Sequence, residues 1–578
     1  MARPKRSHLS ELDLQALIDE VNEDNDSDYR ADSDIEISED ESHSGSSSID
    51  LGESSSRLDL DLDLDPQTES ERPGPSGDGP DHPDEWTYDM TGIGTNVRDF
   101  TQVSGPTHPL DLDAEPIEYF FLLFPVSFFD TMVTETNRYA RQHPEINQRW
   151  TPVTVPELKA YLSIYFYMGI QHLSDWRDYW STDEILNHPF VSNLMIRNRF
   201  EEINKNFHLA DNTANPDRGR AGHNPLHRVQ PILDLAKNTW PANFQPGKNL
   251  CVDEAMIKFK GRCPFLQYMP AKPTKWGIKA WAICDSKTFY MLDINIYAGK
   301  HDQLENPDRP LGDRVVLALT QQFRDKNHVV YFDNYFSSLP LFETLENNGL
   351  YGCGTLRTNR KGFPAFVKDP KCVKNPGDTV RMRKGNVQVI AWFDRRKVTL
   401  ASNAHDASDT ILTRRARPNT PRPECSQPMA IKQYNLNYFG VDKNDQLRQY
   451  YSIASKAHKY WKYIFWFIVD VCAVNAYILY LLAPGGPRPK LMSHKEFNLS
   501  LVRSLAGNFT SRKRMGRPLK RPAGHELTRI NTKRGQRDCV GCKEVGKKTN
   551  SGKAVQTKLE CLSCGKALCR PCFETKHQ

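Results

Sequence analysis

Three aspartates lie in segments where a bare carboxylate is unexpected. Asp253 lies in CVDEAMIKFKGR, Asp333 in HVVYFDNYF and Asp442 in YFGVDKNDQL. The first two segments are rich in β-branched and aromatic residues, which predicts buried strands. A carboxylate in an apolar strand is costly unless something pairs with it. Because Mg²⁺ prefers oxygen ligands, the three aspartates predict a site for two metal ions that serves phosphoryl transfer on nucleic acid.

Other roles are open for each aspartate taken alone. Asp253 or Asp333 could end a strand, cap a turn or pair with a lysine. Asp442 and Asp445 stand three residues apart at the predicted start of a helix, so they share one face and suit its positive end. The combination, rather than any one residue, favours a metal site.

The C-terminal region carries a second ligand pattern. Paired thiolates at this spacing are ligands of structural Zn²⁺. Seven ligands are one short of two four-coordinate sites, so His525 or a water could supply the eighth, or one site alone could be complete. The interleaved pairs are typical of RING- and PHD-like cross-brace fingers, which bind DNA, histone tails or ubiquitin-conjugating enzymes. The seven candidate ligands are Cys539, Cys542, Cys561, Cys564, Cys569, Cys572 and His577.

Charge is distributed very unevenly along the 578 residues. Residues 11–90 hold 27 Asp and Glu against 3 Lys and Arg, a net charge of −24. Because the whole chain is +4 and residues 1–10 add +3, residues 91–578 carry +25. A basic body behind an acidic tail favours a polyanionic partner such as nucleic acid, although a solvated basic surface would give the same balance.

Cysteine usage and hydropathy bear on the cellular compartment. Clustered CxxC pairs without a secretory signal favour metal binding in a reducing compartment over disulfides. The N-terminus, MARPKRSHLSELDL, has no apolar signal core.

Residues 464–482 are strongly apolar, but they include Asp470 and Asn475. Since an Asp at a membrane centre costs about 2.5–3.5 kcal/mol, this stretch predicts a buried helix of a globular core and no membrane partner.

The elements needed to position these groups can be read from periodicity. Residues 1–95 are rich in Ser, Asp and Glu and predict disorder. Residues 114–245 have helical periodicity. From residue 250 onward, strand segments alternate with a predicted helix at 311–324, and residues 387–403 predict a hairpin. Helical patterning resumes after Asp442 and continues to about Leu482, so the chain predicts a multidomain α/β fold.

These motifs, in this order, resemble those of piggyBac-type DNA transposases. The matching segments are VDEAMIKFKGR, YFDNYFSS, GTLRTNRKGFP at 354–364 and YN–GVDKNDQLRQYYS at 434–452. The resemblance covers about residues 115–578. The family usually carries Gly-Gly before its third Asp, whereas this chain has Phe439-Gly440. The resemblance implies an RNase H-like core with three catalytic aspartates.

Carried over by motif, Asp253, Asp333 and Asp442 would hold Mg²⁺ or Mn²⁺, with Asp445 in support. Trp461, in HKYWKY, resembles a family Trp that contacts DNA, although helix packing explains it equally well. The resemblance further implies double-stranded DNA as partner, excision through hairpin intermediates, joining at TTAA targets and a zinc finger that reads transposon ends. A homodimer in the nucleus is expected, since two ends must be synapsed.

A basic run, SRKRMGRPLKRP, precedes the finger. It suits a nuclear localisation signal or phosphate contacts, and GRP within it resembles an AT-hook core that places Arg in the minor groove. A solvated linker is the alternative. The candidate DNA-binding residues in this run are Arg512, Lys513, Arg514 and Arg517.

The resemblance and the composition together predict the domain order. It begins with a disordered acidic tail and ends with the zinc finger, and the β insertion and the catalytic core interrupt a helical dimerisation and DNA-binding domain. Two competing hypotheses are a domesticated transposase that binds DNA or chromatin without cutting, and a finger protein of the ubiquitin ligase type. The predicted boundaries are 1–95 (tail), 96–248 (helical), 249–358 (core), 359–424 (insertion), 425–446 (core), 447–510 (helical), 511–537 (basic linker) and 538–578 (finger).

Overall fold

The computed structural model describes residues 85–270, 275–299, 304–413, 424–453, 459–483, 491–511, 525–531 and 535–577. The chain divides into a larger unit, Met1–Ser192 with Arg197–Phe509, and a smaller unit, Asn193–Ile196 with Thr510–Gln578. Residues 1–84 of the acidic tail and the four candidate DNA-binding residues at 512–517 lie outside the described residues.

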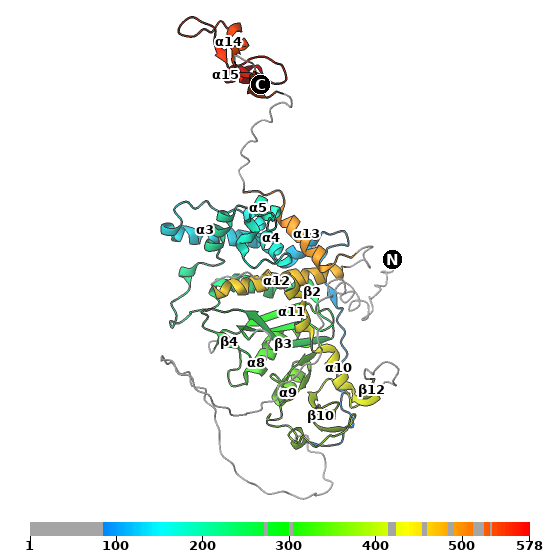
Figure 1. Cartoon of the computed structure of the whole chain (residues 1–578). Helices are drawn as coiled ribbons and strands as arrows, with labels where there is room; N and C mark the ends of the chain where they lie inside the picture. Colours follow the sequence, from blue (N-terminus) through cyan, green and yellow to red (C-terminus); the bar gives the residue numbers. More distant parts are fainter. Residues whose placement is uncertain are drawn as a thin grey trace, which may run out of the picture. The chain divides into compact units, whose positions relative to one another are not determined.

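A nine-stranded mixed sheet is the centre of the larger unit (Figure 1). Its order is β4-β5-β3-β7-β8-β11-β10-β9, and β6 pairs with β5 next to β4, along the edge away from β3. The predicted hairpin, β10 with β11, is present and extends this same sheet. The strands are β3 (Asn249–Lys258), β4 (Leu266–Tyr268), β5 (Trp276–Asp285), β6 (Met291–Ile296), β7 (Val329–Phe332), β8 (Tyr351–Thr355), β9 (Thr379–Lys384), β10 (Val387–Phe393) and β11 (Lys397–Ser402).

Two parallel pairings lie at the middle of the sheet, β3 with β7 and β7 with β8. Parallel neighbours need crossover connections, which usually contain a helix. Here α8 (Leu311–Thr320) precedes β7 and α9 (Leu339–Asn347) follows it. Every residue of β7 is buried, as expected for a strand covered on both faces. The predicted α/β fold class is confirmed.

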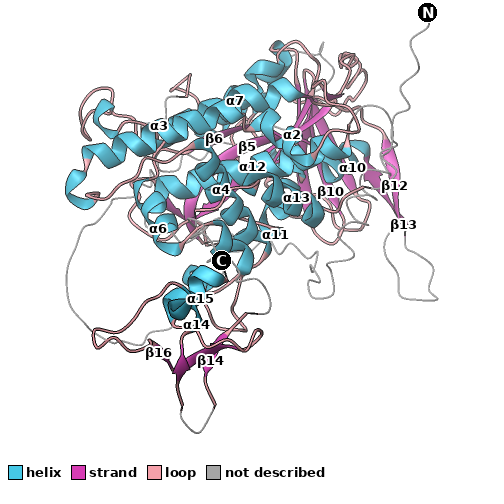
Figure 2. Cartoon of the chain, turned by 90° about the horizontal axis from the view of Figure 1, so that it is seen from above, coloured by secondary structure: helices cyan, strands magenta, loops and turns pink. Residues whose placement is uncertain are grey.

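Helices that precede the main-sheet strands in the sequence, and helices that follow them, cover the sheet (Figure 2). α12 (Tyr460–Leu481) contacts β3 on one side and α2, α7 and α13 on others. Short strand pairs β1 (Gly105–Pro106) with β2 (Phe244–Gln245), and β12 (Asp409–Thr413) with β13 (Glu424–Pro428), lie outside the main sheet. The other helices of this unit are α2 (Pro116–Leu123), α3 (Val126–Gln142), α4 (Val155–Ile170), α6 (Arg197–Asn206), α7 (Gln230–Asn243), α10 (Met429–Asn437), α11 (Gly440–Tyr450) and α13 (His494–Ala506), while α5 (Pro189–Leu194) crosses into the smaller unit.

The predicted apolar stretch is the core helix α12. It is long and apolar enough to cross a membrane, yet its apolar window is entirely buried within the unit. Its two polar interior residues are satisfied there. The Asn475 amide donates to the Met291 carbonyl at 2.8 Å and accepts from the Met291 N–H at 3.0 Å, which ties α12 to β6. Asp470 accepts from the Ser452 hydroxyl at 2.8 Å and from the Ile453 amide at 2.9 Å.

The smaller unit has short elements only. β14 (Leu527–Arg529) pairs with β17 (Leu559–Cys561), and β15 (Arg537–Asp538) pairs with β16 (Gln556–Thr557). Two short helices, α14 (Val540–Glu544) and α15 (Arg570–Lys576), complete the described part of this unit.

The buried carboxyl of Asp470 predicts a pH-dependent stability. Burial raises its pKa to about 7, although Arg448 and the two hydrogen bonds oppose the shift. The unfolded carboxyl ionises near pH 3.9, so the folded state binds more protons between about pH 4 and 7 and loses stability as pH rises. Asp470→Asn, which cannot ionise, should show a smaller fall in melting temperature from pH 5 to pH 8 than wild type.

Asp217→Asn is the matched control, because the Asp217 side chain is 82% exposed. It should keep the pH dependence of the wild type. An unchanged slope in Asp470→Asn would show that the carboxyl is not the group responsible.

Candidate functional site

The parallel pairing of β3 with β7 brings two of the predicted aspartates to neighbouring positions. Val252 lies opposite Phe332 in the register, so the next residue on each chain segment is an aspartate, Asp253 and Asp333. Neighbouring strands are about 4.8 Å apart. Both aspartates are half-buried. Two residues that are 80 apart in the sequence therefore lie side by side at the end of β7.

The third aspartate arrives on α11, which packs on β3 and β5. Gly440, at the start of α11, makes this close approach possible, because a Cβ there would lie 2.6 Å from the Cys251 Sγ. Asp442 follows two residues later and is exposed. Phe439 stands where the family usually has a first glycine, and its ring lies 6.0 Å from the ring of Phe289. The glycine that the packing requires is thus retained.

Two tyrosines beside α11 are close enough to the aspartates to be affected by their charge. The rings of Tyr434 and Tyr438 stack with centroids 5.1 Å apart. Burial and the charges of Asp333 and Asp253 raise the pKa of Tyr434. Burial and the charges of Asp442 and Asp253 raise the pKa of Tyr438. All three carboxylates therefore contribute negative potential around this pair, an arrangement that a divalent cation would stabilise.

Sequence reasoning gave these tyrosines no role. The available signal was their spacing: Tyr434, Tyr438 and Asp442 follow one another at intervals of four residues. Cys251 was also overlooked. It belongs to β3 and its sulfur faces Gly440 of α11, and burial, with the charges of Asp253 and Asp442, raises the pKa of its thiol.

Asp445 lies one turn beyond Asp442 and has a cationic partner. The guanidinium of Arg448 lies 3.3 Å from its carboxylate and 4.4 Å from the centre of the Phe467 ring of α12. The pair links α11 to the core helix. Such a residue can position α11, as expected for a supporting acid.

Glu254, directly after Asp253, is directed elsewhere. Successive side chains of a strand point to opposite faces, and Glu254 forms an ion pair with Lys279 of β5. The Lys279 ammonium lies 4.6 Å from the centre of the Tyr335 ring, two residues after Asp333. The Glu254 carboxylate is therefore neutralised by Lys279 on the face of β3 opposite Asp253.

Trp461 lies in the core. It is 1% exposed, and its ring centroid lies 5.2 Å from that of His208 and 6.2 Å from that of Phe207. Helix packing is therefore what the structure shows for this side chain. Contact with DNA stays a prediction.

Among the described residues, two groups of four side chains place all their ligand atoms within 4.8 Å of one another, and both lie in the smaller unit. His525 completes the second group, so it is the eighth candidate ligand. The pairs interleave along the chain, which is the predicted cross-brace order. The groups are Cys539, Cys542, Cys569 and Cys572, and His525, Cys561, Cys564 and His577.

The distances within each group suit tetrahedral coordination. A Zn–S bond of about 2.3 Å implies sulfur atoms roughly 3.8 Å apart. The Cys542 Sγ lies 3.7 Å from that of Cys569 and 3.6 Å from that of Cys572. In the other group, the Cys564 Sγ lies 3.4 Å from the His577 Nε2 and 3.7 Å from the His525 Nδ1.

Backbone amides prepare one thiol for ligation. The amides of Cys569 and Cys542 donate to the Cys539 Sγ at 3.2 and 3.5 Å. Although burial opposes it, these hydrogen bonds help to lower the pKa of Cys539 to about 7. A thiolate is the form that binds metal.

The smaller unit has little else to hold it together. Apart from cysteines, its buried cluster contains Leu568 and Phe573. Units of this size usually need disulfides or a metal to fold, and all six of its cysteines are free thiols. The donor sets and the small core both favour a structural metal in each group.

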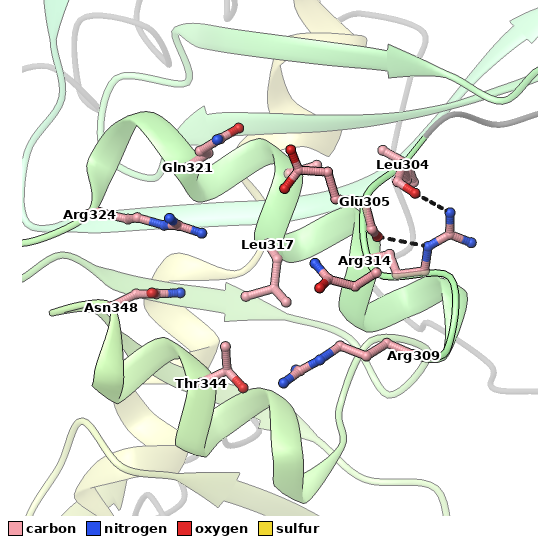
Figure 3. A pocket seen from close by; sticks show the side chains of 11 residues that line it. Leu304, Glu305, Arg309, Arg314, Leu317, Gln321, Arg324, Thr344 and Asn348 are labelled. Carbon is pink, nitrogen blue, oxygen red and sulfur yellow. Dashed lines mark hydrogen bonds between the residues drawn. The ribbon is translucent and has the colours of Figure 1, made fainter.

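A cavity of about 330 Å³ lies between α8 and α9, away from the three aspartates (Figure 3). Arg309 and Arg324 point into it from opposite sides. Arg314 instead donates to the carbonyls of Leu304 and Glu305, which holds the preceding loop on α8. The other lining residues are Asn306, Leu317, Ala318, Gln321, Thr344 and Asn348. The predicted catalytic residues do not line this cavity.

Comparison with known proteins agrees with this geometry. The family model described as Transposase IS4 matches residues 115–477. The human PiggyBac transposable element-derived protein 5 is 27% identical over 426 residues, which cover 71% of this chain and 78% of the relative. The human PiggyBac transposable element-derived protein 2 is 25% identical over 428 residues, or 70% of this chain and 68% of the relative.

A solved structure is similar over most of this chain. The cryo-EM structure of a piggyBac transposase synaptic complex with hairpin DNA superposes with a TM-score of 0.62 at 25% identity, covering 81% of this chain and 98% of that chain. The predicted resemblance is confirmed, and the chain belongs to this transposase family as a piggyBac-type member.

Proposed function

We propose that this protein is an active cut-and-paste DNA transposase. It would bind transposon ends, cleave the strands with hairpin intermediates, and join the element to TTAA target DNA. The observation that carries the proposal is the placement of Asp253 and Asp333 on adjacent strand ends with Asp442 brought against β3 by α11. A protein that only binds DNA has no physical need for three carboxylates gathered at one place.

The three carboxylates suit Mg²⁺ or Mn²⁺, because both ions prefer oxygen ligands. Bound there, such ions would stabilise charge on the attacking and leaving oxygens of a phosphoryl transfer. The chain itself would position the ligands: the β3–β7 pairing fixes Asp253 beside Asp333, and α11 delivers Asp442. Asp445 and Arg448 would hold α11 in register on the core.

Cations beside Asp333 support a nucleic acid substrate. In the segment GTLRTNRKGFP, Arg357 donates to the Asn334 side-chain oxygen at 2.9 Å, and Arg360 donates to the Asn334 carbonyl at 3.3 Å. Guanidinium groups match phosphate oxygens well. Both contact Asn334, the residue directly after the proposed metal ligand Asp333, where a scissile phosphate would need neutralisation.

The smaller unit would read the transposon ends with Zn²⁺ in both ligand groups. A homodimer would synapse two ends, and the basic run before the finger would direct the protein to the nucleus. The names of the human relatives, transposable element-derived proteins, favour a second candidate, which is a domesticated DNA- or chromatin-binding protein without cleavage activity.

Asp253→Asn should abolish cleavage. Because it removes a charged ligand from the metal site, release of a DNA segment flanked by the cognate ends should fall by more than about 100-fold, measured from a plasmid with Mg²⁺. Asp445→Asn should cost less, about 10–100-fold, which is typical of residues that support ligands.

Asp217→Asn, on the surface, is the charge-matched control and should release the segment normally. Full activity of Asp253→Asn would show that the metal site is assigned to the wrong residues. A wild-type protein that binds the ends but never cuts them with Mg²⁺ or Mn²⁺ would establish the binding-only alternative.

The finger should contain two zinc ions per chain by elemental analysis. His525→Ala should lose about one, because it removes a ligand of one group only, whereas His172→Ala, which changes an exposed histidine, should keep both. Cys561→Ser with Cys564→Ser should weaken binding to the ends while the thermal transition of the larger unit stays in place. Purified protein without zinc would contradict the assignment.

A further inference from the structure

Two aromatic side chains are exposed together on the edge strand of the main sheet. Tyr268 of β4 is 52% exposed and Trp276 of β5 is 44% exposed. They lie directly opposite each other in the antiparallel pair. Their ring centroids are 4.7 Å apart with a tilt of 42°. Two large rings left partly in water lose the favourable free energy of burial, so their joint exposure indicates a binding partner.

The surroundings of this pair are basic. Residues 255–284 contain no Asp or Glu. Three cations in the segments next to these two strands are exposed, and long basic side chains around aromatic rings are typical of surfaces that track a nucleic acid backbone while bases stack on the rings. Lys260 and Arg262 lie between β3 and β4, and Lys275 directly precedes Trp276.

The pair faces the same way as the first catalytic candidate. Asp253 lies opposite Ala282, and directly opposite residues of an antiparallel pair share a face. Trp276 is six residues from Ala282 along β5, and residues an even number apart also share a face. The register shift in β5 lies outside this stretch, at Ile283 and Cys284. Asp253, Trp276 and Tyr268 therefore lie on one face of the sheet.

The separation is set by the strand rise. Six residues of β5 at about 3.4 Å each span roughly 20 Å. The pair therefore lies roughly 20 Å along the sheet from Asp253. An aromatic ring cannot stack on a base inside an intact duplex, because its faces are already covered. It can stack on a base that is unpaired or at an end.

We propose that Tyr268 and Trp276 form a stacking platform for an unpaired DNA base, roughly 20 Å along the sheet from Asp253. The inference rests on the proposed function, because strand cleavage would leave unpaired nucleotides in the DNA near the cleavage point. The platform holds a strand after its partner has been displaced. The flanking cations hold the backbone on either side of the stacked base.

The test compares single-stranded and duplex DNA of equal length, without added divalent cation so that no cleavage occurs. The double variant Tyr268→Ala with Trp276→Ala should lose about tenfold or more in affinity for a 20-nucleotide oligo(dT), measured by fluorescence anisotropy on the full chain. Affinity for a 20-base-pair duplex, which depends on the cations, should stay within twofold of wild type.

Two further variants separate stacking from folding. Tyr268→Phe with Trp276→Phe keeps both rings and should restore affinity for the single strand. Tyr88→Ala changes another exposed tyrosine, 69% accessible and followed by Asp89, and should change neither affinity. An equal loss for both DNA forms, or no loss for the single strand, would overturn the platform.

The outcome is independent of whether the protein cuts DNA. If wild type never cleaves but the alanine variant loses single-strand affinity, the platform stands and the cleavage function fails. If wild type cleaves and the alanine variant binds the single strand as tightly as wild type does, the platform fails and the cleavage function stands.

Discussion

The parallel pairing of β3 with β7 is the constraint on which the rest of the larger unit depends. A parallel neighbour cannot be reached by a tight turn, so the chain must leave the sheet and return through α8. That return fixes the register of Val252 against Phe332, and a slip of one residue would turn a carboxylate into the core. The helices that cover both faces exclude water from β7. The sheet thus places two charges at its end while keeping the strand before them apolar.

Sequence reasoning reached the strands, the core helix, the ligand pairs of the finger and the three aspartates, because each leaves a local signal. An apolar strand that ends in Asp, or a CxxC pair, is visible within a few residues. The roles of Asp445 and Trp461 were less accessible. Whether an acid contacts Arg448, or a ring lies against His208, depends on which helices meet. His525 shows the same limit: the sequence left open whether His525, a water or no further group completed the second site, and the fold brings His525 beside Cys564.

The two units differ in the interactions that stabilise them. The larger unit buries an almost entirely apolar helix, and two polar residues inside that helix are matched by hydrogen bonds: Asn475 with the Met291 backbone, and Asp470 with Ser452 and Ile453. The smaller unit buries very few apolar side chains besides its cysteines. Its two groups of thiol and imidazole side chains could each hold a structural metal, and metal binding contributes to the folding of such small units.

The contact between Gly440 and Cys251 has a practical consequence. Because a single added carbon would collide with the sulfur, α11 closes over this thiol with no room for a chemical modifier. Cys251 is fully buried and lies under the helix that carries Asp442. Alkylation of Cys251 would require α11, with Asp442, to move away from the sheet. The rate of alkylation would therefore measure how often the three aspartates separate.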